Sequence, residues 1–395
     1  MRIAHIITRM IVGGAQENTL LCCRDLIHTF GDDVLLLCGA EQGPEGTLLE
    51  DVKSSNIPLE IVPGLQRAVH PINDMLVYRR LKAILRHYQP DVVHTHSAKG
   101  GILGRLAAWH VKVPAVVHTV HGAPFHSYQH ALSRTLSRWC ETFAARRCHA
   151  LVSVADAMTE QLVRTNVAPR DRFVTIYSGM DVTSFVNAAK HREVTRERLG
   201  YTPEHLVVGK VARLFHLKGH EYLIRAAEQL VPRYPQLRFL LVGDGILRTE
   251  LQRMIQNAGL TDHVQFTGLV EPSRIPEYLA AMDLAVHTSL REGLARVLPQ
   301  ALLAGCPVIS YDVDGAREVV IDGQTGFLLP PQSVDELANA IEQMVVNPDL
   351  RKRMAEEGRR LCEERFPHER MTEQLRHLYQ QLLNQESNLG SVKAF

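Results

Sequence analysis

Short runs of β-branched and other apolar residues alternate with longer amphipathic segments along almost the whole chain of 395 residues. In the first half, the apolar runs cover residues 3–7, 34–38, 92–95, 115–119, 151–154 and 174–176. Continuous apolar runs are typical of strands buried on both faces, and helical patterns between them are typical of crossovers that connect parallel strands. The alternation therefore predicts an α/β fold, with parallel sheets covered by helices on both faces.

A second series of apolar runs follows a polar interval at residues 187–204. It covers residues 206–211, 239–242, 264–267, 284–287, 307–310 and 327–329. Because a chain of this length exceeds what one core usually serves, we expect two doubly wound, Rossmann-like domains, at residues 1–190 and 191–366. An amphipathic helix at 367–385 is expected to cross back to the first domain. Two such sheets facing each other would form a cleft, with ligands beyond the carboxyl ends of the strands.

Composition limits the partners. The 44 basic and 43 acidic residues nearly balance, which argues against a phosphate-neutralising surface for nucleic acid. The seven cysteines contain no CxxC pair and indicate reduced thiols. No stretch reaches the roughly 18 apolar residues that a membrane span needs, and the first apolar run is too short for a signal peptide. We therefore expect a cytoplasmic protein, with contact at the inner face of a membrane left open.

Two cations follow the strand predicted at 206–211. Arg213 and Lys218 lie between this strand and the helical pattern at 219–230. Cations at the carboxyl end of a strand can stabilise a departing diphosphate as negative charge develops on it. Two solvated loop cations are the alternative interpretation, and the spacing alone does not separate the two.

A carboxylate is predicted to join these cations. Glu292 and Gly293 end a loop, and a helix is expected to begin directly after them. The carboxylate could then accept hydrogen bonds from vicinal hydroxyls, while the amides of Leu294 and Ala295 meet the same ligand. A capping acid is the alternative. With the cations, Glu292 predicts a site for a phosphate-bearing sugar.

Paired glycines, Gly13 and Gly14, follow the first predicted strand and precede a helical pattern. They would let the backbone approach a ligand closely and leave helix N-terminal amides for an anion. The chain has neither GxGxxG nor GxxxxGK[ST] at this turn, so a purely structural turn remains an equal alternative.

Together these motifs resemble those of the retaining GT-B glycosyltransferases of family four, over nearly the whole chain. The shared features are Arg213-x4-Lys218, Glu292-Gly293 with Gln300 eight positions after the Glu, Gly305-Cys-Pro-Val-Ile309, Gly13-Gly14, the segment 91–96, His121-Gly122, the segment 242–245 and the segment 266–268. The resemblance implies transfer of a sugar, with retention, from a nucleotide-diphosphate sugar, with UDP- or GDP-sugars favoured, to a hydroxyl acceptor. Polysaccharide, lipopolysaccharide or glycolipid synthesis is the expected context.

The resemblance also assigns roles to single residues. Arg213 and Lys218 would bind the donor diphosphate, with Gly14 against it and Gly13 beside it. Glu292 would hold sugar hydroxyls, and Gly293, Leu294 and Ala295 would complete that pocket. The nucleotide would be contacted by Asp244, Phe266, Gly268 and Leu269, with Glu318 nearby, and His121 would face the anomeric carbon. The family has a glutamate where this chain has Gln300, a ribose contact, so the departure bears on nucleotide affinity more than on the reaction.

Metal chemistry is not expected. The histidines at 94, 96 and 118 invite a zinc interpretation, but no acid or thiol is placed with them. Asp312 and Asp314 match an Asp-x-Asp pattern by coincidence, because Arg213 and Lys218 already supply positive charge. The expectation is therefore no metal and no cofactor besides the nucleotide sugar. A packed or solvated His121 is the alternative to a catalytic one.

Two features suggest acceptor contacts in the first domain. Lys99 opens a helix and could meet an anionic acceptor, or be an ordinary helix start. The segment 128–148 combines arginines with apolar residues at helical spacing, at Arg134, Arg138, Arg146, Arg147, Leu132, Leu136, Trp139 and Phe143. Such a helix could rest on anionic lipid and bring the enzyme to a lipid-linked acceptor. A charged face over a core stripe is the alternative.

Three other functions share parts of this pattern. Non-hydrolysing sugar-nucleotide epimerases have the same two-sheet plan but need no acceptor. A nicotinamide-dependent dehydrogenase would fit doubly wound sheets, although the GxGxxG signature is missing. A non-catalytic sugar-nucleotide binding module is suggested only by Gln300.

Overall fold

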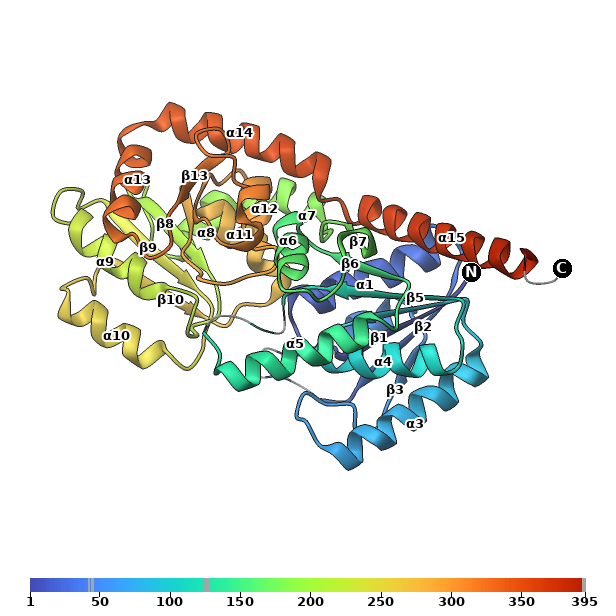
Figure 1. Ribbon diagram of the computed structural model, residues 1–395. Helices are drawn as coiled ribbons and strands as arrows, with labels where there is room; N and C mark the ends of the chain where they lie inside the picture. The colour runs from blue at the N-terminus through green and yellow to red at the C-terminus, as the bar shows by residue number, and fades with distance from the viewer. Residues whose placement is uncertain (42, 44–45, 124, 126–127, 393–395) are drawn as a thin grey trace. The chain divides into compact units, whose positions relative to one another are not determined.

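The structure is a computed structural model that describes residues 1–41, 43, 46–123, 125 and 128–392 (Figure 1). The chain forms two compact units: Met1–Met180 with His368–Phe395, and Asp181–Pro367. Each unit contains one parallel sheet with helices on both faces. The α/β class predicted from the alternating pattern is therefore confirmed.

The sheet of the first unit has the strand order β3-β2-β1-β4-β5-β6-β7. Its strands are β1 (Arg2–Arg9), β2 (Asp33–Gly39), β3 (Leu59–Ile61), β4 (Val92–His96), β5 (Ala115–Val120), β6 (Ala150–Ser153) and β7 (Phe173–Thr175). All described pairings are parallel. The apolar pattern missed β3, because this edge strand has only three residues and is half-buried or exposed.

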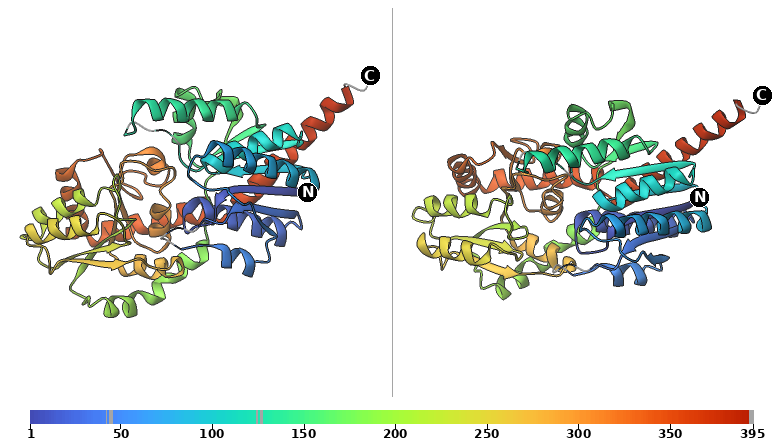
Figure 2. Two further views of the ribbon diagram at one scale, coloured as in Figure 1. Left: turned by 90° about the horizontal axis from the view of Figure 1, so that it is seen from below. Right: turned by 60° about the horizontal axis from the view of Figure 1, so that its bottom comes forward.

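Helices cover both faces of this sheet. They are α1 (Gly14–His28), α2 (Leu49–Ser54), α3 (Pro71–Tyr88), α4 (Ala98–His110), α5 (Ala131–Ala145), α6 (Asp156–Arg164) and α15 (His368–Val392), with a 3-10 turn η1 at Arg170–Arg172. Apolar side chains of α3, α4, α5 and α6 pack in one core on one face, and those of α1, α2 and α15 pack in a second core on the other. In Figures 1 and 2, α3, α4 and α5 lie side by side.

The C-terminal helix belongs to the first unit. Four of its side chains, Met371, Leu375, Leu378 and Tyr379, are buried in the core that also contains α1. His368 at its start bonds Asp25 of α1 through Nδ1, at 2.7 Å from Oδ2. In Figures 1 and 2 this helix, drawn in red, lies beside α1. A segment nearly 190 residues away in sequence thus completes the first core.

The sheet of the second unit has the order β10-β9-β8-β11-β12-β13. Its strands are β8 (Leu206–Val211), β9 (Leu237–Val242), β10 (Val264–Gly268), β11 (Leu284–His287), β12 (Val308–Tyr311) and β13 (Gly326–Leu329). Its helices are α7 (Val182–Val186), α8 (Arg192–Arg198), α9 (His220–Leu230), α10 (Arg248–Asn257), α11 (Ile275–Ala281), α12 (Val297–Leu303), α13 (Val334–Val346) and α14 (Pro348–Arg365), with 3-10 turns η2 (Asn187–His191), η3 (Pro272–Arg274) and η4 (Asp314–Glu318).

The division between the units falls after Met180, about ten residues before the boundary that the polar interval suggests. That interval is not a linker, because it forms η2 and α8 and packs on α11. Arg192 donates to the carbonyls of Ala280 and Met282 at 2.6 and 2.7 Å, and Arg196 donates to Asp283 at 2.9 Å. Polar residues of this interval therefore donate hydrogen bonds to the backbone carbonyls at the C-terminal end of α11.

Within the part of the chain that the structure describes, no helix combines the length and apolar character needed to cross a membrane.

Candidate functional site

The carboxyl ends of β8 and β11 bring Lys218 and Glu292 together in the second unit. Lys218 Nζ lies 2.5 Å from Glu292 Oε1. His287, the last residue of β11, places Nε2 at 3.4 Å from the same oxygen and Nδ1 at 3.0 Å from Ser310 Oγ of β12. The acid and the cation that the sequence pairs for a phosphate-bearing sugar thus share one site, at the edge where doubly wound sheets bind ligands.

The turn between β8 and α9 fixes the position of Lys218. Gly219 has φ of 67°, and a Cβ there would lie 2.0 Å from the Thr288 carbonyl oxygen. Thr288 Oγ1 donates to the Gly219 carbonyl at 2.6 Å, and the Leu290 amide donates to the Leu217 carbonyl at 2.8 Å. The turn therefore lies against the segment after β11, and only glycine combines that close approach with positive φ.

The charge of Glu292 is stabilised inside the protein. Burial by itself raises the pKa of its carboxyl, but Lys218 and then His287 outweigh burial, so that the pKa lies well below its usual range. The Glu292 amide donates to Asp314 Oδ2 at 2.6 Å, which orients the backbone on the other side. An ionised carboxylate held in this way is a hydrogen-bond acceptor suited to hydroxyl groups.

Two members of this site were missed by the sequence reasoning. His287 ends β11, and the only signal was a polar residue at the end of an apolar run. Lys210 lies within β8, is 2% exposed, and donates from Nζ to Thr288 Oγ1 at 2.9 Å. Burial, and then Lys218, lower the pKa of Lys210 from 10.5 to about 7. A lysine inside an otherwise apolar strand was the available signal, since such side chains are rarely fully buried.

The expectation of a helix directly after Glu292 is wrong. Helix α12 begins at Val297, and Gly293, Leu294 and Ala295 form the turn before it. Pro299 within α12 is compatible with a first helical turn but not with a helix that started several residues earlier. Leu294 and Ala295 are 7% and 4% exposed, so their side chains pack inside while their backbone passes beside Glu292.

Gln300 lies in α12 at intermediate burial. Its backbone amide donates to the Arg296 carbonyl at 3.1 Å, within the first turn of the helix.

Arg213 is exposed, and its guanidinium carbon lies 5.0 Å from the centre of the Phe215 ring. It follows β8, as predicted, on the same turn as Lys218. The distance of 2.5 Å given above connects Lys218 to Glu292. The cation pair therefore consists of one half-buried and one exposed member.

Residues assigned to the nucleotide gather at the carboxyl ends of β9 and β10. Arg248 Nη1 lies 2.8 Å from Asp244 Oδ2, and its guanidinium carbon lies 5.5 Å from the centre of the Phe266 ring. The Gly243 amide donates to the Gly268 carbonyl at 3.1 Å, which joins the two loops. Leu269, the next residue, is 59% exposed. The structure therefore brings Asp244, Phe266 and Gly268 together, with Arg248 as an additional cation.

The segment after β12 contains Glu318 and the Asp-x-Asp pattern. Glu318 ends η4 at intermediate burial, and its carbonyl accepts from Arg365 Nη1 at 2.8 Å. Asp312 Oδ1 accepts from Arg317 Nε at 3.0 Å, whereas Asp314 accepts from the Glu292 amide. The two aspartates thus serve different partners.

Gly13, Gly14 and His121 belong to the first unit. Gly14 begins α1 after the loop that follows β1, and Gly13 precedes it with extended backbone. A Cβ at Gly13 would meet only the flexible end of Gln16, at 2.8 Å, among the described residues. His121 follows the end of β5, and its Nε2 lies 3.1 Å from Nδ1 of His96.

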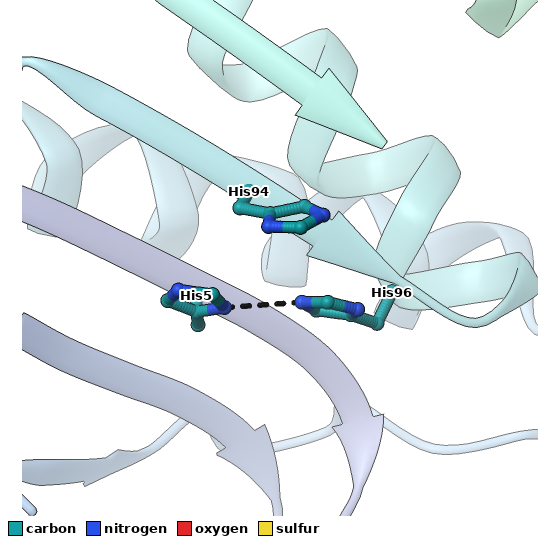
Figure 3. A group of neighbouring side chains, drawn as sticks. All are labelled: His5, His94 and His96. Carbon is teal, nitrogen blue, oxygen red and sulfur yellow. Dashed lines mark hydrogen bonds between the residues drawn. The ribbon is translucent and has the colours of Figure 1, made fainter. Parts of the chain in front are cut away.

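Four more histidines lie in the strands behind His121. His5 of β1 and His94 and His96 of β4 are buried with their rings close together (Figure 3). Burial lowers the pKa of His5 from 6.5 to about 3 and holds the pKa values of His94, His96 and His118 well below their usual value. His94 is held at Nδ1 by the Tyr379 hydroxyl at 2.5 Å and at Nε2 by Thr119 Oγ1 at 2.7 Å.

The structure places the two predicted acceptor contacts, Lys99 and α5, in different surroundings. Lys99 Nζ lies 2.7 Å from Asp74 Oδ1 and also donates to the Ala68 carbonyl, so it links α4 to the start of α3. The apolar residues of α5 instead face solvent: Leu132, Leu136, Trp139 and Phe143 are 82%, 59%, 63% and 37% exposed. The alternative in which they form a core stripe is therefore wrong.

A cavity of about 430 Å³ lies elsewhere in the second unit. Arg192, Asp283, Arg351 and Arg359 are among the residues that line it, beside α8 and α14. Asp283 precedes β11, so this cavity lies toward the amino ends of the strands, away from Lys218 and Glu292. We assign it no role in the site.

Both units match known protein families. Residues 191–361 match the family described as glycosyl transferases group 1, and residues 13–179 match the glycosyl transferase 4-like domain. Among curated proteins, the chain is 30% identical over 344 residues to an Escherichia coli UDP-Gal:alpha-D-GlcNAc-diphosphoundecaprenol alpha-1,3-galactosyltransferase, covering 86% of this chain and 87% of the relative. It is 28% identical to the putative glycosyltransferase EpsD of Bacillus subtilis, covering 83% and 86%.

Solved structures share the fold. HepE of Anabaena, solved in complex with UDP-glucose, superposes with a TM-score of 0.81 at 23% identity, covering 96% of this chain and 100% of that one. WaaG, a glycosyltransferase involved in lipopolysaccharide biosynthesis, superposes with a TM-score of 0.71 at 18% identity, covering 92% and 95%. These likenesses establish the GT-B architecture of two Rossmann-like domains.

Proposed function

Because the chain belongs to the glycosyl transferases group 1, a family of GT-B enzymes that act on nucleotide sugars, we propose that it transfers a sugar from a UDP-sugar to a hydroxyl acceptor with retention at the anomeric carbon. The observation that carries the proposal is the contact between Lys218 and Glu292 at the carboxyl ends of β8 and β11. UDP is favoured over GDP because the Escherichia coli relative is named for UDP-galactose and HepE was solved with UDP-glucose.

The two charges have complementary tasks in this reaction. Glu292 accepts hydrogen bonds from sugar hydroxyls and orients the ring. Lys218, with Arg213 on the same turn, stabilises the diphosphate as the bond between the anomeric carbon and the phosphate oxygen breaks. The acceptor oxygen bonds to the anomeric carbon on the same face, and its proton passes to a phosphate oxygen of the departing diphosphate. This charge comes from side chains, so we propose that neither a metal nor another cofactor is needed.

Replacement of Lys218 tests the assignment. Lys218→Ala is expected to lower turnover about 100-fold or more, because the developing charge on the diphosphate loses its cation, with little change in the KM of the acceptor. Lys352→Ala, at an exposed lysine of α14, is the matched control. Equal turnover in Lys218→Ala and the parent protein would refute the role.

The reaction class is tested with UDP-galactose, UDP-glucose and a GlcNAc-diphosphate-lipid acceptor. NMR of the product linkage is expected to show the anomeric configuration of the donor, and EDTA is expected to leave the rate unchanged. Conversion of the sugar nucleotide without an acceptor would instead identify an epimerase. An inverted linkage or loss of activity in EDTA would contradict the mechanism.

We propose further that the acceptor is lipid-linked and that α5 rests on an anionic membrane. The name of the Escherichia coli relative specifies an acceptor on diphosphoundecaprenol. In this chain, Leu132, Leu136, Trp139 and Phe143 occupy an arc of about 60° on a helix that turns about 100° per residue. The packed residues Glu141, Ala144 and Ala145 centre roughly opposite this arc, so α5 has one apolar side in the core and another in solvent.

The charges around this apolar side fit an anionic surface. The described helix and the two residues after it contain Arg134, Arg138, Arg146 and Arg147. Their one acidic residue, Glu141, is 1% exposed and is neutralised by Arg105 of α4, with 2.8 Å between Nη1 and Oε1. Exposed positive charge near lipid headgroups contributes about 1 kcal/mol per basic residue, and the exposed aromatic rings can enter the interface.

Vesicle binding tests this surface. The protein is expected to sediment with vesicles containing phosphatidylglycerol more than with pure phosphatidylcholine, and the tryptophan emission, to which Trp139 contributes, should shift to the blue. Trp139→Glu should abolish most of this binding, whereas Val346→Glu, at an apolar residue of similar exposure in the second unit, should not. Equal binding by both variants, or no preference for the anionic vesicles, would refute the proposal.

A further inference from the structure

Three imidazoles form a hydrogen-bonded row that ends at the predicted catalytic histidine, His121. His5 Nδ1 lies 3.0 Å from His96 Nε2, and His96 Nδ1 lies 3.1 Å from His121 Nε2. Figure 3 shows the first of these bonds, between β1 and β4. The row therefore runs from the interior of the first unit to the residue after β5, and its outermost member is His121.

The row can carry its protons in only two ways. A neutral imidazole has one N–H donor and one acceptor nitrogen. In the first arrangement His5 donates to His96 and His96 donates to His121. In the second, every bond is reversed: His121 donates to His96, His96 donates to His5, and the remaining proton of His5 lies on Nε2. The two arrangements therefore differ at the inner end of the row, because only the second places a proton on Nε2 of His5.

The inner end selects the first arrangement. Nε2 of His5 is buried and has no hydrogen-bond partner among the residues that the structure describes. A buried N–H without an acceptor loses its hydrogen bond to water outright, whereas an unused acceptor nitrogen is the less unfavourable orphan. The proton of His5 is therefore placed on Nδ1, where it meets His96.

From this direction we infer that His5 and His96 are positioning residues that fix the tautomer of His121, with its proton on Nδ1 and its Nε2 accepting from His96. His121 then carries its N–H on Nδ1 and does not act as a base through Nε2. To accept a proton there, the whole row would have to reverse and leave an unpaired N–H on His5. The value of this arrangement for sugar transfer rests on the proposed function, but the tautomer itself does not.

Burial leaves the two inner members of the row, His5 and His96, neutral, and the neighbouring groups have partners of their own. Those that face it are His94 of β4, His118 of β5 and Tyr379 of α15. Tyr379 and Thr119 occupy both nitrogens of His94, and His118 Nδ1 lies 2.9 Å from Thr95 Oγ1. Burial, and then His94 and His5, hold the pKa of His96 well below its usual value.

The same geometry argues against a metal among these rings. Ligand atoms of His5, His94 and His96 all lie within 4.8 Å of one another, which would admit an ion. However, His5 Nδ1 and His96 Nε2 already share a hydrogen bond, and both ring nitrogens of His94 are hydrogen-bonded, to Tyr379 and Thr119. An ion would have to break these bonds, so the hydrogen-bonded row accounts for the cluster better.

Long-range ¹H–¹⁵N correlation spectra of the full-length protein test the inference directly. His121→Asn identifies the resonances of His121 by their loss. The expected result at pH 7.5 is a protonated Nδ1 and an unprotonated Nε2 for His121. A protonated Nε2, or a charged ring, would overturn the inference, and so would equimolar Zn²⁺ that shifts His5 and His96 and is reversed by a chelator.

Two substitutions at the inner end separate positioning from packing. His5→Asn keeps a donor near the position of Nδ1–H and should preserve both the tautomer of His121 and turnover. His5→Phe keeps a ring but removes the donor, so a second tautomer of His121 should appear and turnover should fall about 10-fold or more at similar KM. Loss of turnover in both variants with an unchanged tautomer would overturn the inference. Absence of transfer in the parent protein would count against the proposed function alone.

Discussion

The buried lysine of β8 predicts an unusual dependence of stability on pH. Lys210 is 2% exposed, and burial together with Lys218 lowers its pKa from 10.5 to about 7, while Glu292 acts in the opposite direction. Above pH 7 the folded protein therefore holds Lys210 uncharged. The unfolded chain keeps the same lysine protonated until about pH 10.5.

The size of the effect follows from proton linkage. Between pH 7 and 10.5 the unfolded chain binds one more proton at Lys210 than the folded protein does, so the free energy of unfolding rises with pH by about 1.4 kcal/mol per unit. Over the whole interval this amounts to roughly 5 kcal/mol. Below pH 7 both states are protonated and the slope disappears. Lys210→Met removes the titration, so the variant should be more stable at pH 7, and its advantage should shrink as pH rises.

Guanidinium unfolding between pH 6.5 and 9.5 measures this difference. Far-UV circular dichroism follows the whole protein, whereas the two tryptophans, Trp109 and Trp139, both lie in the first unit and report on it separately. Lys352→Met, at an exposed lysine, should give a difference from the parent that does not change with pH. A constant difference between Lys210→Met and the parent across this range would refute the reasoning.

Two further predictions concern stability. Gly243→Ala should lower the free energy of unfolding by more than about 2 kcal/mol, because φ is 132° and the new Cβ would lie 2.2 Å from the Ala212 carbonyl oxygen. Gly259→Ala is the control, because its φ is 67° and no described atom lies within 4 Å, and it should lower the free energy of unfolding by about 1 kcal/mol. Equal losses for the two variants in denaturant melts would contradict this prediction. Asp283→Asn should lose about 2 to 4 kcal/mol by circular dichroism, because Arg196 and Arg192 would keep poorly compensated charges, and a loss below 1 kcal/mol would show that their carbonyl partners suffice.

The pattern of apolar runs was sufficient for the α/β class because strands buried on both faces must be apolar throughout. It was not sufficient for β3, whose edge position needs no apolar run. The two units divide after Met180 rather than within the polar interval at 187–204, for a related reason. Arg192 and Arg196 satisfy the carbonyls at the end of α11, and a sequence cannot distinguish such buried hydrogen bonding from a solvated linker.

For the site, the sequence placed Lys218 after the strand at 206–211 and Glu292 in a later loop, and it suggested that the two charges serve one ligand. Tertiary structure decided which groups meet them. His287 and Lys210 lie in this site because β8 and β11 are neighbours in the sheet although they are far apart in sequence. This arrangement places His287 beside Glu292 and Lys210 beside Thr288. The direction of the histidine row was likewise decided only in three dimensions, since it depends on a nitrogen of His5 that the fold leaves without a partner among the described residues.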